Sequence, residues 1–150
     1  MTKGNEIAEF KLQCSTATCT AGEAGSKILS FNFWGEGTGS YGLGRLMGTV
    51  TFDTGQQGKM EYCGVAFLES GELFNSSATG TYKSVGKHQW STRMLLHSSD
   101  SSVTLSEGLI DLVTGSWNGR LFEWMPEGHG RISYALEHYR SRSNYAVRGY

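Results

Sequence analysis

The feature that most constrains the fold of this chain is a two-residue alternation of apolar and polar side chains, which recurs in short segments along most of its length. This period is typical of a β-strand with one buried and one exposed face. Turn sequences such as Asp53-Thr54-Gly55 and Ser98-Ser99-Asp100 separate the segments. No interval has a sustained helical repeat with caps. The pattern therefore predicts strands at residues 6–13, 28–34, 46–53, 59–68, 72–83, 88–97, 102–112, 116–124 and 131–139.

Glycine indicates how these strands are arranged. The chain has 21 glycines and one proline in 150 residues. Some glycines fall inside predicted strands, where a barrel needs bends or bulges. A long antiparallel meander tends to close on itself, because closure removes exposed sheet edges. We therefore expect residues 1–150 to form one all-β domain, a single up-and-down barrel of about eight to nine strands, with a two-sheet sandwich as the alternative. The glycines inside predicted strands are Gly48, Gly64, Gly80, Gly108 and Gly119.

Charge and cysteine content narrow the possible partners. Thirteen basic and 14 acidic residues give a net charge of −1, which predicts neither nucleic-acid nor membrane binding. Lys3, Glu6 and Glu9 stand where a signal peptide needs apolar residues, so we expect a cytoplasmic location. The three cysteines are expected to be free thiols, with no metal site and no cofactor. The polar segment 13–27 and the basic tail 139–150 are expected to be mobile.

A glycine-punctuated segment resembles those of known barrel families. Residues 33–44, FWGEGTGSYGLG, resemble the opening of lipocalin-like and fatty-acid-binding-like barrels and the similar run of nitrobindin-like haem barrels. Residues 48–52 resemble strands of allene oxide cyclase-like and dirigent-like barrels. These resemblances cover about a tenth of the chain and imply a closed barrel. The nitrobindin comparison implies a haem-ligating histidine near the C-terminus, for which His138 is the candidate.

Alternation also sorts side chains into interior and exterior faces, because one face of each strand must lie inside. A buried carboxylate or imidazole costs several kcal/mol unless it is paired, so an inward polar residue is a candidate for a functional site. The structural alternatives are a satisfied core histidine, solvated carboxylates at the barrel end, and tyrosines that only pack. The polar residues on the predicted interior faces are Tyr62, His88, Glu107, Glu123, Tyr134 and His138.

These residue types suit general acid–base chemistry on an apolar substrate. The predicted catalytic residues are Glu107, His88, Glu123 and Tyr62. The predicted substrate-binding residues are Trp90, Trp117, Phe33, Met94, Tyr134 and His138. The first functional hypothesis is a cofactor-free cyclase or isomerase acting on a small apolar molecule inside the barrel. The alternatives are a non-catalytic binding protein and a solid barrel that acts in oligomeric interactions, such as a homodimer. A cavity above about 300 Å³ would favour a ligand.

Overall fold

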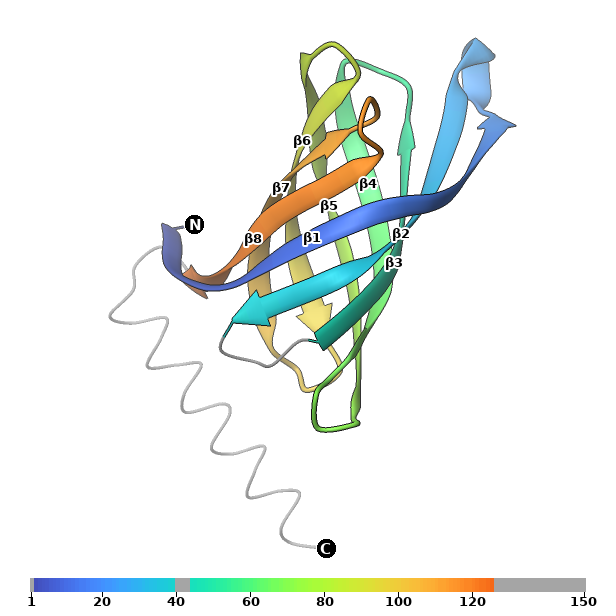
Figure 1. Ribbon diagram of the computed structural model, residues 1–150. Helices are drawn as coiled ribbons and strands as arrows, with labels where there is room; N and C mark the ends of the chain where they lie inside the picture. The colour runs from blue at the N-terminus through green and yellow to red at the C-terminus, as the bar shows by residue number, and fades with distance from the viewer. Residues whose placement is uncertain (1, 40–43, 126–150) are drawn as a thin grey trace, which may run out of the picture.

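The computed structural model describes residues 2–39 and 44–125, which form eight antiparallel strands (Figure 1). Each strand pairs with the next in sequence, and β8 pairs with β1, so the sheet closes into a barrel. This confirms the predicted all-β up-and-down barrel over the sandwich. The ninth predicted strand, 131–139, lies outside the described residues. The strands are β1 (Thr2–Ala21), β2 (Lys27–Gly39), β3 (Gly44–Asp53), β4 (Gln57–Phe67), β5 (Leu73–Gly86), β6 (Gln89–Ser98), β7 (Val103–Asp111) and β8 (Ser116–Met125).

The segment 13–27 is not the long loop that its composition predicts. β1 continues to Ala21, and a short 3-10 turn over Glu23–Gly25 connects it to β2. Beyond Gln13, β1 pairs with β2 alone, and the resulting hairpin projects from the barrel (Figure 1). Every second residue from Thr16 to Thr20 is a β-branched threonine, which favours extended backbone. The segment is polar because both faces of the hairpin are largely exposed.

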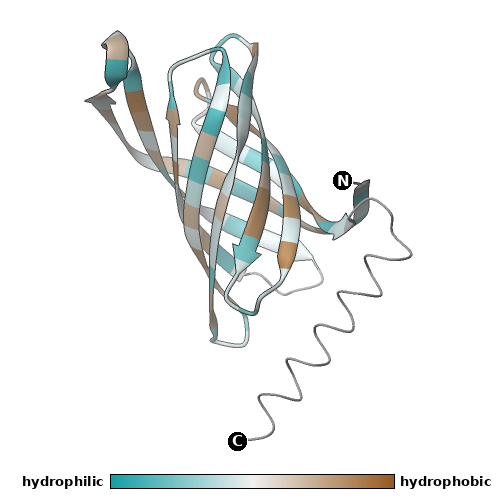
Figure 2. Ribbon diagram, turned by 180° about the vertical axis from the view of Figure 1, so that it is seen from behind, coloured by the Kyte–Doolittle hydropathy of each residue, from teal (hydrophilic) through white to brown (hydrophobic). Residues whose placement is uncertain are grey.

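Aromatic side chains fill the barrel near the turns at 54–56, 87–88 and 112–115. Ring centroids lie 4.8 Å apart for Phe52 and Tyr82, 5.6 Å apart for Phe52 and Trp90, and 5.4 Å apart for Phe33 and Trp117. Hydrophobic and hydrophilic residues alternate along the strands that enclose this core (Figure 2). No helix in residues 2–39 and 44–125 is long and apolar enough to cross a membrane. The aromatic packing closes one end of the barrel interior.

Glycines inside the strands make room for aromatic rings. Gly48 and Gly64 are directly opposite each other on β3 and β4, and a Cβ on either would overlap the ring of Tyr62. Gly108 and Gly119 are likewise opposite each other on β7 and β8, beneath the rings of Phe10 and Trp117. The pairing runs through both positions without a register shift. The predicted positions are therefore correct, but the glycines admit large interior side chains and do not mark bulges.

Candidate functional site

A partly open cavity of about 80 Å³ lies inside the barrel, toward the end that carries the β4–β5 and β6–β7 turns. Its walls come from every strand except β2. None of the lining residues that the structure describes carries a charge. The cavity has three parts. The floor consists of Phe10, Leu12, Tyr62, Met94 and Trp117. The apolar wall consists of Ile7, Leu46, Ala66, Phe74, Leu96 and Leu121. The hydroxyl wall consists of Ser76, Ser98, Ser102, Thr104 and Ser106.

Trp117 separates the cavity from the aromatic end of the barrel. Its side chain is buried, and its Nε1–H donates a hydrogen bond to Thr92 Oγ1 at 3.2 Å. The ring meets Phe10 and Tyr62 edge to face, with centroids 5.2 Å and 5.6 Å away. Because its one polar atom is already paired, Trp117 offers a ligand mainly its apolar ring.

Tyr62 is the one titratable group among the described lining residues. It lies on β4, with its ring over the Gly48–Gly64 pair. Burial raises the pKa of the Tyr62 phenol, and the neighbouring Ser76 hydroxyl offsets part of this rise. The phenol is therefore neutral at pH 7, where it can donate or accept a hydrogen bond.

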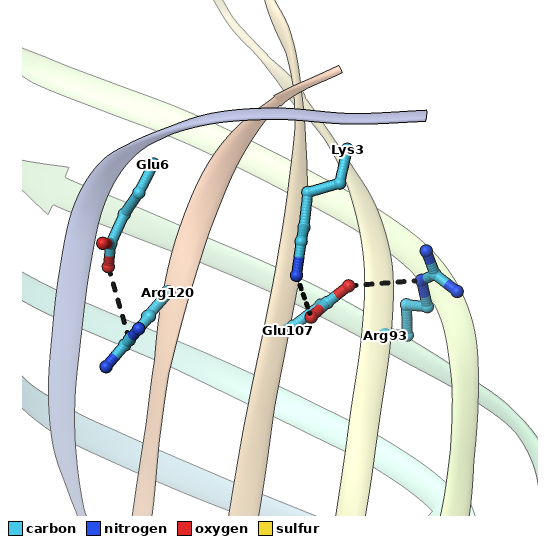
Figure 3. A network of polar contacts seen from close by, with 5 residues as sticks. All are labelled: Lys3, Glu6, Arg93, Glu107 and Arg120. Atoms are coloured by element: carbon cyan, nitrogen blue, oxygen red, sulfur yellow. Dashed lines mark hydrogen bonds and ion pairs between the residues drawn. The ribbon is translucent and has the colours of Figure 1, made fainter. Parts of the chain in front are cut away.

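Glu107 lies on the outside of the barrel, contrary to the sequence prediction. Its carboxylate pairs with Lys3, with Nζ 3.3 Å from Oε2, and with Arg93, with Nε 3.6 Å from Oε1 (Figure 3). The residues of β7 that face the cavity are Thr104 and Ser106. Leu105, which alternates with them, is only 1% exposed although it lies on the outer face. Because Leu105 is apolar, the outer face of β7 resembles an interior face in the sequence, and Glu107 lies on that outer face.

The structure also separates the other predicted acid–base residues. His88 lies in the turn between β5 and β6, with a left-handed φ of 57°, and is exposed rather than inward-facing. Glu123 shares the interior face of β8 with Trp117 and Leu121, but it is exposed near the end of that strand and does not line the cavity. Glu107, His88 and Glu123 therefore do not form an acid–base pair.

The predicted substrate-binding residues divide into three groups. Trp117 and Met94 line the cavity. Phe33 is buried, and Trp90 packs against the aromatic core, but neither lines the cavity. Tyr134 and His138, with the basic tail 139–150, lie outside the described residues.

Sequence reasoning missed the hydroxyl wall. Thr104, Ser106, Gly108 and Ile110 form the interior face of β7, but three of these residues are small or polar and resemble an exterior face. The available signal was the size of these side chains. A run of small residues on one face of a strand leaves space inside a barrel that large residues fill elsewhere.

Among the described residues, neither a cysteine nor a metal-binding cluster lines the cavity. Cys14, Cys19 and Cys63 are free thiols, and none lines it. Within the described part of the chain, no group of three or more His, Cys, Asp or Glu side chains could hold a metal ion.

The fold and the cavity define a class of protein, namely a closed eight-stranded antiparallel barrel with an uncharged internal pocket. Comparisons with protein-family models, with curated proteins and with solved structures find no match. Arguments about function therefore rest on the geometry of the site.

Proposed function

We propose that this protein binds a small, largely apolar molecule in the barrel cavity and does so without catalysing a reaction on it. The observation that carries the proposal is the uncharged, mainly apolar lining beneath a partly open mouth. Ligand sites are typically concave and mostly apolar, with a few polar groups that fix orientation. The lining of this cavity has that composition, because most of its residues are apolar and a few carry hydroxyl groups.

The size of the cavity limits the ligand. Its volume of about 80 Å³ is well below the roughly 300–1,000 Å³ of sites for drug-sized molecules. The ligand is therefore either a molecule of few heavy atoms or a larger one that inserts a narrow apolar group. In either case the inserted group rests against the floor formed by Trp117 and its neighbours.

Binding is better supported than proton transfer. General acid–base catalysis needs a titratable group within hydrogen-bond reach of the substrate. Tyr62 is the one such group among the described lining residues, and its raised pKa keeps it protonated at pH 7. The carboxylate of Glu107 and the imidazole of His88 lie outside the cavity. A cyclase or isomerase that uses these residues is therefore not the function we propose.

The indole N–H of Trp117 is a suitable reporter of binding. Toluene would be titrated into ¹⁵N-labelled protein, and a Trp117→Phe spectrum would assign the indole signal. We expect a saturable shift of that signal. Ala66→Leu places a larger side chain in the cavity wall and should weaken the shift. Val65→Leu, at the neighbouring outward-facing position, is the matched control. If neither toluene nor its hydroxylated analogue benzyl alcohol shifts the Trp117 signal in the native protein, the proposal is wrong.

A second candidate function rests on an apolar stripe outside the barrel. Trp34 and Phe67 are about 40% exposed, and their rings stack with centroids 6.2 Å apart and an interplanar angle of 16°. The same face carries exposed Met47, and Glu36 and Arg45 form an ion pair beside it. A two-fold pairing of copies could place Glu36 opposite Arg45 of the other copy.

This second candidate is a homodimer formed through the stripe. Exposed apolar patches of this kind often mark interaction sites. Sedimentation of the native chain and of Trp34→Ser would test it. Val113→Ser, which changes an exposed apolar residue in the β7–β8 turn, is the control. We expect Trp34→Ser alone to abolish the dimer, and a native chain that stays monomeric at high micromolar concentration would exclude this function.

A further inference from the structure

None of the cavity-lining residues in the described part of the chain carries a charge with which to balance a charged ligand. Lys3, Arg93 and Glu107 pair on the outer surface, as do Glu6 and Arg120 (Figure 3). Glu123 shares the interior face of β8 and lies opposite Thr104, but it is exposed near the end of the strand and does not line the cavity. A carboxylate buried without a cation or several hydrogen-bond donors loses several kcal/mol of solvation. The pocket therefore disfavours anionic ligands such as carboxylates, and the same argument applies to cations.

The cavity nevertheless has unused hydrogen-bonding capacity on one side. The hydroxyl wall comes from the adjacent strands β5, β6 and β7 and from Ser102 just before β7. Within residues 2–39 and 44–125, the hydroxyls of Ser98, Ser102, Thr104 and Ser106 form no hydrogen bond with another protein group. Each hydroxyl can donate one hydrogen bond and accept others. A ligand oxygen at this wall can therefore be either an acceptor or a donor.

The opposite side of the cavity offers no such partner. Among the described residues, β1 and β3 contribute Ile7 and Leu46 on this side, and neither has a side-chain polar atom. A polar ligand atom placed here would lose its hydrogen bonds to water without replacement. The two walls together therefore select the orientation of the ligand as well as its chemistry.

We infer that the ligand is an uncharged, mainly hydrocarbon molecule with one or two hydroxyl or carbonyl oxygens, such as a small alcohol, ketone, ester or lactone. Its oxygen meets the hydroxyl wall, at Thr104 and Ser106 in the first half of β7, and its hydrocarbon part lies against the apolar wall and Trp117. This inference rests on the proposed function, because it specifies the ligand of the same cavity.

Three probes of similar shape test the inference on the native protein. They are benzyl alcohol, which is neutral and oxygenated, toluene, which lacks oxygen, and benzoate, which is anionic at pH 7.5. Each would be titrated while the Trp117 indole signal is followed. We expect benzyl alcohol to bind about threefold to tenfold more tightly than toluene, the range that one net hydrogen bond supplies. We expect benzoate to bind at least tenfold more weakly than benzyl alcohol.

Two variants that each remove one hydroxyl group test whether the hydroxyl wall binds the oxygen of the ligand. Thr104→Val keeps the shape of the side chain, and Ser106→Ala removes a single oxygen. Each should reduce the preference for benzyl alcohol over toluene. Thr79→Val, on the exposed outer face of β5, is the matched control and should change neither affinity.

The outcomes separate this inference from the proposed function. If none of the probes binds, the proposed function fails and the inference fails with it. If benzoate binds as tightly as benzyl alcohol, the pocket function stands and the neutral-ligand inference is overturned. If toluene and benzyl alcohol bind equally in the native protein and in both variants, the role of the hydroxyl wall is overturned. The comparison of the three probes on the native protein requires no variant to fold.

Discussion

Replacing Gly48 with alanine is expected to destabilise the barrel, because Tyr62 occupies the space that the new methyl group needs. A Cβ on Gly48 would lie 2.8 Å from Tyr62 Oη and 2.9 Å from Cζ, well inside van der Waals contact. Gly48 does not have a left-handed φ, so alanine fits its backbone. The cost is therefore overpacking, about 1–3 kcal/mol. At roughly 2–4 °C per kcal/mol for a chain of this size, the Tm should fall by about 2–12 °C.

A double-mutant cycle assigns this loss to the ring. Tyr62→Leu removes the three side-chain atoms nearest to the new methyl group, namely Cε2, Cζ and Oη. In that background Gly48→Ala should be neutral or stabilising by about 0.5–1 kcal/mol, since alanine loses less backbone entropy than glycine. Urea unfolding followed by circular dichroism measures all four proteins, and Gly55→Ala in an exposed turn, which should stay within about 0.5 kcal/mol, is the control. An equal loss in both backgrounds would refute the reasoning.

Three further predictions concern single contacts. Thr92→Val should cost about 1–3 kcal/mol in denaturant unfolding, because it leaves the Trp117 indole N–H buried without its acceptor, and unchanged stability would contradict this. His88→Gly should raise the Tm, because glycine relieves the left-handed φ of 57°, and a lower Tm would speak against a strained turn. Hydrogen bonds from Gln89 and from the Val113 N–H lower the pKa of Asp111. The folded state therefore binds this proton more weakly than the unfolded chain. The resulting stability is present above the usual aspartate pKa of about 4 and is lost as the pH falls through the lower folded value. Asp111→Asn should make unfolding less sensitive to pH as the pH falls below about 4, and an unchanged pH profile would count against the turn contacts.

The strands and the closed topology could be predicted because every strand has one face that must avoid water. Alternation placed Trp117, Met94 and Tyr62 inside correctly, since each has a polar, exposed neighbour on its strand, namely Asn118, Arg93 and Glu61. Closure could be expected because it removes the edges that an open meander of this length would expose. The alternation within each strand and the number of consecutive strands can both be read directly from the sequence.

The candidate site could be predicted only in part, because it depends on what lies across the barrel. Leu105 and Phe122 are opposite each other on outer faces yet almost fully buried, and Lys3 Nζ lies 4.4 Å from the centroid of the Phe122 ring. Alternation cannot distinguish such a covered outer face from the interior, so Glu107 was assigned to the wrong side. His88 was misplaced for a local reason, because the turn at 87–88 lacks the Asn-Gly or Asp-Gly pair that marks a two-residue hairpin turn in a sequence. The size of the cavity depends on side chains from seven strands together and has no signature in any one of them.

The pairing of β1 with β8 has a consequence for how this chain folds. Phe10 is opposite Gly119, so the contact that closes the barrel joins residues more than a hundred positions apart. Pairings of such high sequence separation form slowly, because the entropy of a long loop must be lost first. During synthesis the outer edges of β1 and β7 stay unpaired until β8 has left the ribosome. The interval before closure is therefore the period in which copies of the nascent sheet can join edge to edge. The rate at which β8 docks onto β1 therefore determines what fraction of newly made chains closes before such association occurs.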